Sequence, residues 1–147
     1  MARLIYLLDT NIISERIKAE PNPRVDTRLH KYSSHLATAA TVWHELLFGV
    51  ESMPSSRRQS ALREYLETAV LAEMPILPYD DKAAHWHALE RARLKSKGQT
   101  PSFSDGQIAA IAATNKLTLV TRNVKDFRFF AGLRIENWFQ PEHAKAD

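Results

Sequence analysis

The stretch RLIYLLDTNIISERIKAE, residues 3–20, holds the pattern that decides the fold. Its first six residues are mostly apolar, and a run this short and apolar is typical of a buried strand. The Asp-Thr-Asn triplet at residues 9–11 then offers three helix-capping side chains, and a helix is predicted up to the prolines that follow the stretch. The chain therefore opens with a buried strand that passes directly into a helix.

The rest of the chain repeats this alternation of short apolar runs and helical segments. Further strands are predicted at residues 35–40, 75–79, 117–121 and 133–136, and further helices at residues 24–32, 41–52, 55–72, 82–97 and 104–115. This order is typical of an α/β fold with three layers, in which helices flank a central, mostly parallel sheet of about five short strands. Such sheets bind ligands beyond the carboxyl ends of their strands, so the residues that follow strands are the first candidates for a site.

The composition is that of a globular protein. A length of 147 residues suits one domain, and we expect this domain to span residues 1–139, followed by a polar, flexible tail at residues 140–147. Because cysteine is absent, disulfide scaffolds, cysteine zinc sites and thiol nucleophiles are excluded. The net charge of +3 is compatible with a nucleic-acid partner but does not demonstrate one.

No export or membrane signal is predicted. Asp9 interrupts the N-terminal apolar run, and no small-residue cleavage site follows it. The longest apolar stretches, such as residues 108–113, are far shorter than the ~18 residues needed to cross a bilayer. We therefore expect a cytoplasmic protein without a membrane partner.

Two acidic residues occupy positions where a carboxylate is unexpected. Asp9 directly follows the first strand, which is usually central and buried in such folds, and either a helix cap or a functional group would explain it. Asp105 lies in the first turn of the helix predicted at 104–115, and residues three, four and seven positions later form an apolar face. An ionised carboxylate on that face is costly unless it is paired or bound to a metal. Because Ser104 is available as the N-cap, the position of Asp105 favours function over structure.

Two further acids are less informative on their own. Glu45 borders the apolar stripe of the helix predicted at 41–52, where a solvated glutamate is also common. Gly49, one turn later, is predicted to serve a close approach to another segment. Asp126 lies in the turn after strand 117–121, where local backbone hydrogen bonds would account for it, and only its place beyond a strand end suggests more.

Considered together, three of the four acids are expected to gather at one edge of the sheet, with Glu45 reaching in from a helix. Like charges this close cannot all stay ionised without a cation. Clusters of oxygen ligands suit Mg²⁺ or Mn²⁺, and such an ion can activate a water and neutralise charge at a reacting phosphate. The acids therefore predict metal-dependent hydrolysis of a phosphodiester.

A family resemblance is carried by four strings: LLDTN, WHELLFG, PSFSDGQIAAIAA and TRNVKDF. In this order and spacing they resemble the signature blocks of PIN-domain ribonucleases, and most closely those of VapC-type toxins of bacterial toxin–antitoxin pairs. The resemblance spans residues 4 to about 136. It implies that Asp9, Glu45, Asp105 and Asp126 form an acidic metal-binding quartet, supported by hydrogen bonds from Asn11, Thr121 and Asn123. Many relatives carry an additional acid near the last block, where this chain has Asn123.

The resemblance also implies what the protein does. It implies a PIN-like fold and a Mg²⁺- or Mn²⁺-dependent endoribonuclease that hydrolyses RNA phosphodiesters with a metal-activated water. Such a toxin stops translation by cutting RNA, is blocked by a small cognate antitoxin, and commonly forms a homodimer.

Basic side chains gather at the end of the helix predicted at 82–97. They are Arg91, Arg93, Lys95 and Lys97, and no acid lies between them. A solvated helix end explains them, because cations favour a helix C-terminus, and contacts to RNA phosphates are the alternative. His85 and His87 point ~200° apart on a helix, so a packing or surface role is predicted for them and not a metal site.

Two other functions are compatible with an acidic site in an α/β fold. A catalytically silent PIN-like domain would bind RNA or a partner without cutting, and the intact quartet argues against it. A receiver-type phosphoacceptor domain needs paired acids after the first strand, whereas this chain has a lone Asp9. Turnover of labelled RNA, as opposed to stoichiometric binding, distinguishes the nuclease from the silent domain.

Overall fold

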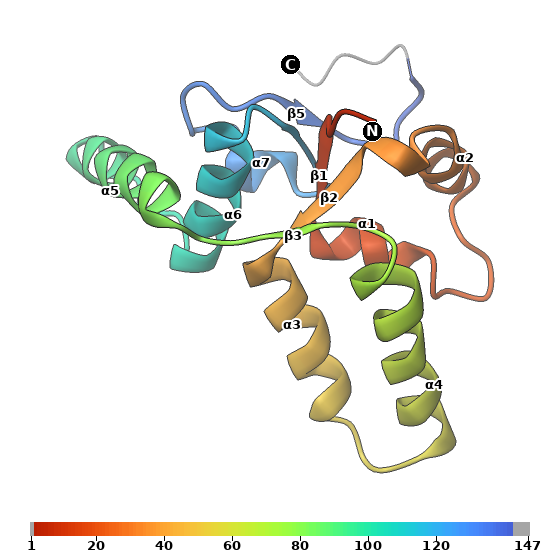
Figure 1. The fold of residues 1–147 in the computed structure, drawn as a ribbon. Coiled ribbons are helices and arrows are strands. Elements are labelled where there is room, and N and C mark those ends of the chain that lie inside the picture. The colour runs from red at the N-terminus through yellow and green to blue at the C-terminus, as the bar shows by residue number, and fades with distance from the viewer. Residues whose placement is uncertain (1, 143–147) are drawn as a thin grey trace.

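A five-stranded sheet forms the centre of the molecule, and all neighbouring strands in it run parallel. The computed structural model describes residues 2–142, so the predicted tail at 140–147 lies largely outside the described residues. The strands are β1 (Tyr6–Leu8), β2 (Leu36–Ala39), β3 (Ile76–Leu77), β4 (Thr118–Val120) and β5 (Ile135–Glu136). Their order is β3-β2-β1-β4-β5, which confirms the predicted α/β fold and places β1 at the centre (Figure 1).

Helices connect the strands and cover the sheet. They are α1 (Thr10–Glu15), α2 (Pro23–Lys31), α3 (Ala40–Glu51), α4 (Arg57–Tyr65), α5 (Asp81–Ser96), α6 (Phe103–Thr114) and α7 (Val124–Phe127), with a 3₁₀ turn at Ser33–His35 and a π-helical continuation of α4 at Leu66–Leu71. Figure 1 shows α3 and α4 projecting together from the sheet, whereas α5 and α6 pack side by side at another side of it. Between residues 2 and 142, no helix is long and apolar enough to cross a membrane.

Helices on both faces of the sheet explain why neighbouring residues of one strand are buried together. Successive side chains of a strand point to opposite faces. Leu7 and Leu8 of β1 are nevertheless both fully buried, and so are Leu119 and Val120 of β4. The strands β1, β2 and β4 are therefore buried along their whole length and mostly apolar, as expected for a parallel sheet that is covered on both faces.

Local hydrogen bonds explain where element boundaries differ from the predictions. Helix α1 ends at Glu15, well before the prolines, because the buried Glu15 carboxylate accepts the Asn22 N–H at 2.8 Å and the chain turns toward α2. The predicted N-cap Ser104 is wrong. Ser102 is the N-cap of α6, and its Oγ accepts the Asp105 N–H at 3.1 Å.

Candidate metal centre at the carboxyl edge of the sheet

Asp9 lies at the point where the central strand ends. Its N–H donates to the Val120 carbonyl at 3.0 Å, which extends the pairing of β1 with β4, and the residue is only 6% exposed. One carboxylate oxygen, Oδ1, accepts the Thr10 N–H at 2.8 Å and caps α1, whereas Oδ2 accepts the Thr121 hydroxyl at 2.7 Å. The cap interpretation is therefore correct, but it accounts for only one of the two oxygens.

Asn11 and Thr121 lie beside the Asp9 carboxylate. The Asn11 amide donates to Asp9 Oδ2 at 3.4 Å and to Thr121 Oγ1 at 3.5 Å, and its carbonyl oxygen accepts the Arg122 N–H at 3.0 Å. Thr121 is fully buried, and its Oγ1 also accepts the Asn123 N–H at 3.0 Å. This bond joins Asn123 to the network through its backbone and does not use its side chain.

Glu45 reaches the site from α3, whose residues Val42 and Leu46 are buried. Its Oε2 accepts the Thr10 hydroxyl at 2.8 Å, a contact that joins α3 to the first turn of α1. The sequence suggests Thr10 only as an alternative helix cap, and no local signal indicates its bond to a residue 35 positions away. The prediction for Gly49 is wrong, because a Cβ built there would meet no atom within 4 Å.

Asp105 lies in the first turn of α6 and is half-buried. Ser102 caps this turn, and the spacing Ser-x-x-Asp that ends on Asp105 is the signal that would have identified the cap. Two residues later, Gln107 Oε1 accepts the Thr41 hydroxyl of α3 at 3.2 Å. The turn that carries Asp105 is thus fixed both by its own cap and by the helix that carries Glu45.

The same turn rests on α5 through a glycine. Gly106 packs against the imidazole of His87, and a Cβ at this position would overlap the ring at Nε2. His87 is buried, its Nδ1 lies 2.9 Å from the Tyr79 hydroxyl, and burial lowers its pKa, with the Arg91 charge acting in the same direction. The packing role predicted for His87 is confirmed, and its contact with Gly106 supports the segment that holds Asp105.

The carboxylates at this edge act on one another electrostatically. Burial raises the pKa of Asp9, neutral hydrogen bonds oppose this rise, and the Glu45 charge adds to it. Burial also raises the pKa of Asp105, and the negative charges of Asp9, Asp126 and Glu45 raise it further. Asp105 therefore lies within electrostatic range of the other three acids, and Asp9 also lies within range of Glu45.

The four carboxylates form an open arrangement and not a closed cage. Within residues 2–142, no three acidic or histidine side chains lie close enough together to enclose one ion. The donor set nevertheless fits a divalent cation that prefers oxygen, because Mg²⁺ takes one or two carboxylates and keeps several waters. Burial and repulsion between the acids raise the pKa of Asp9 and of Asp105. The positive charge of a bound cation would offset both effects and favour the ionised carboxylates.

A hollow of about 360 Å³ lies beside these acids. Asp105 and Asp126 both line it, and Asp126 belongs to α7, a short helix where the sequence predicts only a turn. The rest of the lining consists of Lys125, Phe129 and the loop residues Gln99, Thr100, Pro101 and Ser102. The hollow thus combines negative, positive, hydroxyl and aromatic groups next to the candidate centre.

Arg93, a candidate RNA contact, already has protein partners. Its Nε lies 2.7 Å from Glu90 Oε2, and its Nη2 donates to the Phe129 carbonyl at 2.9 Å. These bonds connect α5 with the segment that follows α7. The structure therefore gives Arg93 a positioning role near the hollow.

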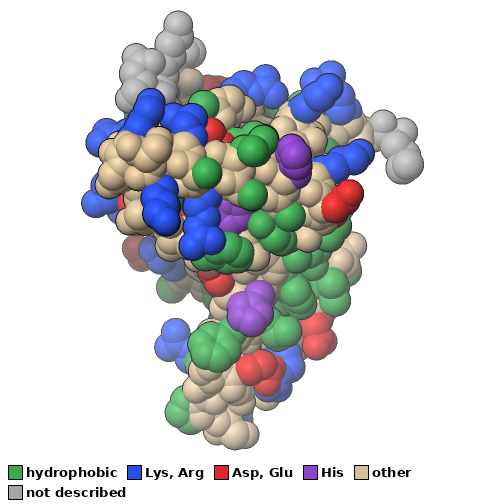
Figure 2. Space-filling model, turned by 90° about the vertical axis from the view of Figure 1, so that its left-hand side faces the viewer, with side chains coloured by type: hydrophobic (Ala, Val, Ile, Leu, Met, Phe, Trp, Pro, Cys, Tyr) green, Lys and Arg blue, Asp and Glu red, His purple; other side chains and the backbone are tan. Residues whose placement is uncertain are grey.

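The other three basic residues at this end of α5 are exposed: Arg91, Lys95 and Lys97. The Arg91 guanidinium lies 5.2 Å from the centre of the Phe103 ring, which is 51% exposed. Figure 2 shows Lys and Arg side chains gathered over the upper part of the face on which α5 lies. Their role as RNA contacts stays a prediction.

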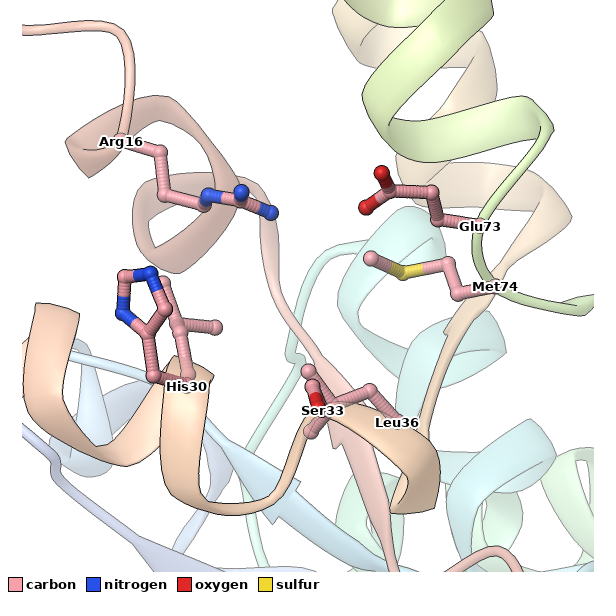
Figure 3. A pocket seen from close by; sticks show the side chains of 7 residues that line it. Arg16, His30, Ser33, Leu36, Glu73 and Met74 are labelled. Atoms are coloured by element: carbon pink, nitrogen blue, oxygen red, sulfur yellow. The ribbon is translucent and has the colours of Figure 1, made fainter.

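A second, smaller cavity of about 170 Å³ lies away from the acids, near the amino ends of β2 and β3. Figure 3 shows Arg16 and Glu73 pointing toward each other across it, with His30 below the arginine. Its remaining lining residues are Leu29, Ser33, Leu36 and Met74. Because parallel strands place the quartet at the opposite edge of the sheet, this cavity is separate from the candidate metal centre.

A parallel sheet with acidic residues at its carboxyl edge is the arrangement of a PIN domain, and the chain belongs to the PIN domain family, which it matches over residues 6–132. Ribonucleases of this family depend on metal ions in general.

Two relatives show where the chain lies within the family. It is 34% identical to toxin FitB of Neisseria gonorrhoeae, over 95% of this chain and 99% of that protein. It is 30% identical to the tRNA(fMet)-specific endonuclease VapC of Salmonella typhimurium, over 92% of this chain and 98% of that protein. The crystal structure of FitAcB from Neisseria gonorrhoeae superposes with a TM-score of 0.86 at 32% identity, covering 93% of this chain and all of that one (100%). The predicted family is confirmed.

Proposed function

We propose that the protein is a metal-dependent endoribonuclease and the toxin of a toxin–antitoxin pair. One observation carries this proposal: Asp105 lies within the field of Asp9, Glu45 and Asp126, Asp9 is buried beside Glu45, and the pKa values of Asp9 and Asp105 are both raised. Carboxylates that are partly buried and repel one another favour binding of a cation, because its charge stabilises their ionised form. The names of the relatives, a toxin and an endonuclease, point to the same activity.

Asp9, Glu45, Asp105 and Asp126 would hold Mg²⁺ or Mn²⁺. The bound ion would supply the positive charge that activates a water and stabilises the phosphate during hydrolysis of RNA. Asp9 is the fixed member of the set, because Thr10 and Thr121 hold its two oxygens. Asp126 is exposed and lines the hollow, so the ligand that it would offer to the ion is open to solvent and to a substrate.

The partners follow from the same assignment. We infer that a small cognate antitoxin binds and blocks the protein, since relatives have been solved as complexes of toxin with antitoxin. The protein would act in the cytoplasm as a homodimer, with residues 1–139 as the nuclease domain.

Isosteric replacement of single acids tests the mechanism. In the purified protein, Asp9→Asn and Asp105→Asn are each expected to lower Mg²⁺- or Mn²⁺-dependent cleavage of RNA by about 10³-fold or more, while the fold stays intact. Asp81→Asn is the matched control, because Asp81 is an exposed acid in the first turn of α5, outside the quartet. Its cleavage should equal that of the wild type.

Circular dichroism reports whether each variant keeps its fold, and labelled RNA reports cleavage. Cleavage that survives both substitutions, or that persists in excess EDTA, would contradict the metal mechanism. Stoichiometric binding of RNA by the wild type without any turnover would instead support the silent PIN-like domain.

A further inference from the structure

Phe129 exposes an aromatic ring beside the candidate metal centre. Its neighbours Phe127 and Phe130 are buried at 1% and 4% exposure, whereas Phe129 is 39% exposed and lines the hollow together with Asp105 and Asp126. The two buried rings are enough to anchor this segment in the core. The third ring is left at the surface, within the lining of the site.

The segment that carries Phe129 is held in place by α5. The largely buried Glu90 accepts the Ala131 N–H at 2.7 Å, and Arg93, paired with Glu90, donates to the Phe129 carbonyl at 2.9 Å. These bonds fix the backbone on both sides of residue 130. The ring is therefore presented by a positioned segment, which lowers the ordering cost of stacking against it.

Positive and polar groups surround the ring. The Arg128 guanidinium lies 5.3 Å from its centre, and Lys125 lines the same hollow. Gln99, Thr100 and Ser102 add amide and hydroxyl groups on the side of the loop before α6. A ligand that matches this set has a flat aromatic body, hydrogen-bonding edges and a negative charge, which together describe a nucleotide.

The size of the hollow also limits its occupant. About 360 Å³ lies at the lower end of the range for small-ligand sites. This volume suits one nucleotide. A neutral or basic peptide would leave the cations of Lys125 and Arg128 without a complementary anion.

We propose that this hollow is a subsite for one unpaired nucleotide of the RNA substrate, with its base stacked on Phe129 and its phosphate near Lys125 and Arg128. The proposal rests on the nuclease function proposed above and assigns a substrate-positioning residue to it. A base can stack on a side chain only when it is free of its own helical stack. Phe129 therefore selects the nucleotide that lies next to the acids.

A binding experiment that needs no turnover tests the subsite. The probes are single-stranded oligoribonucleotides with one 2-aminopurine, moved along the sequence, bound in EDTA so that cleavage is suppressed. Stacking on Phe129 is expected to quench the probe at one position with the wild type and with Phe129→Tyr. Phe129→Leu keeps the apolar bulk and removes the aromatic face, so it should lose this quench and bind about 10-fold more weakly.

The control for losing an exposed apolar side chain is Leu71→Ala. Leu71 is 53% exposed and does not line the hollow, so its removal should leave affinity and quench unchanged. Thermal unfolding of Phe129→Leu close to that of the wild type would show that the fold is preserved, as expected for a half-exposed ring.

Three results would overturn the subsite. The first is a Phe129→Leu variant with unchanged affinity and unchanged quench, and the second is an equal loss of affinity and quench in Phe129→Tyr and Phe129→Leu. The third is the same effect of Phe129→Leu on a probe whose 2-aminopurine is paired in a duplex. Cleavage of the same RNA in Mg²⁺ separates the two proposals. A protein that cleaves but ignores Phe129 keeps the nuclease function and loses the subsite, whereas one that quenches the probe without cleaving keeps the subsite and loses the nuclease.

Discussion

Asp9 and Glu90 are both largely buried carboxylates, but their surroundings act on them in opposite directions. Glu90 has its own cation: Arg93 binds it at 2.7 Å, the Ala131 N–H donates to it, and these bonds lower its pKa. Asp9 receives bonds from neutral donors, and burial beside the Glu45 charge raises its pKa. The difference distinguishes an acid that stabilises the fold from an acid that a cation from solution would neutralise.

The two regions are connected by α5. Through Glu90 and Arg93 this helix holds the segment that carries Phe129, and through His87 it supports the turn that carries Asp105. Helix α5 contributes no acid to the quartet. It supports the segments that carry Asp105 and Phe129, so substitutions in α5 are expected to lower stability more than they lower cleavage.

The largest effect on stability is expected where α5 supports the acidic edge. Gly106→Ala would force a methyl group into the buried His87 ring, so we expect the free energy of unfolding to fall by about 3 kcal/mol, with reduced RNA cleavage because Asp105 is the adjacent residue. Urea unfolding and a cleavage assay measure both. Gly49→Ala is the control, since a Cβ there meets nothing within 4 Å and alanine favours the helix. Equal unfolding curves for wild type and Gly106→Ala would show that the close packing of Gly106 against His87 is not needed for stability.

A smaller loss is expected when the structural acid loses its charge. Glu90→Gln leaves Arg93 without its carboxylate, and urea unfolding should show a loss of about 1–3 kcal/mol. The matched control is Glu51→Gln, which removes the charge from the exposed pair of Glu51 with Arg63 and should cause no measurable loss. If both variants lose the same stability, burial does not distinguish the two ion pairs.

The smallest effect concerns the pH dependence of stability without metal. Because the pKa of Asp9 is raised in the folded state, this residue costs nothing below its ordinary pKa, and it destabilises the fold increasingly as pH rises from the ordinary value to the raised one. The free energy of unfolding of Asp9→Asn, relative to wild type, should therefore increase as pH rises above about 4 and level off above the raised pKa. Glu90→Gln should show the opposite slope, because a lowered pKa gives stability that is present above the ordinary value and lost as pH falls through the folded one.

Saturating Mg²⁺ is the control for this comparison. At pH 7 it should raise the melting temperature of the wild type and remove the advantage of Asp9→Asn, since a bound cation neutralises the same charge. Parallel pH curves for the two variants would contradict the distinction between the two acids.

Much of the fold could be predicted because its signals are local. Asp80 caps α5 and accepts the Ala83 N–H at 2.9 Å, and Gly98 ends the helix with a φ of 75°, so the two ends lie close to those of the helix predicted at 82–97. The positions of Asp9, Asp105 and Asp126 after strands or at a helix start follow from the same local patterns, whereas Glu45 lies within α3. Their expected gathering at one edge depends only on the parallel direction of the strands.

Other features could not be predicted because they join residues far apart in the chain. Thr10 binds Glu45, and Arg93 binds the Phe129 carbonyl 36 positions later. The partner of a hydroxyl or guanidinium group depends on how the helices pack, which no local pattern records. For the same reason the sequence predicts a basic helix end without indicating that Arg93 already has partners.

By itself, the sequence determined the parallel α/β fold and the family and predicted the four acids, because each depends on short-range patterns of polarity and spacing. Only the tertiary structure decided which carboxylates carry a cation of their own and which do not. The charge state of Asp9 or Glu90 is set by burial and by neighbours from other elements of the fold. Those neighbours come together only when the chain has packed.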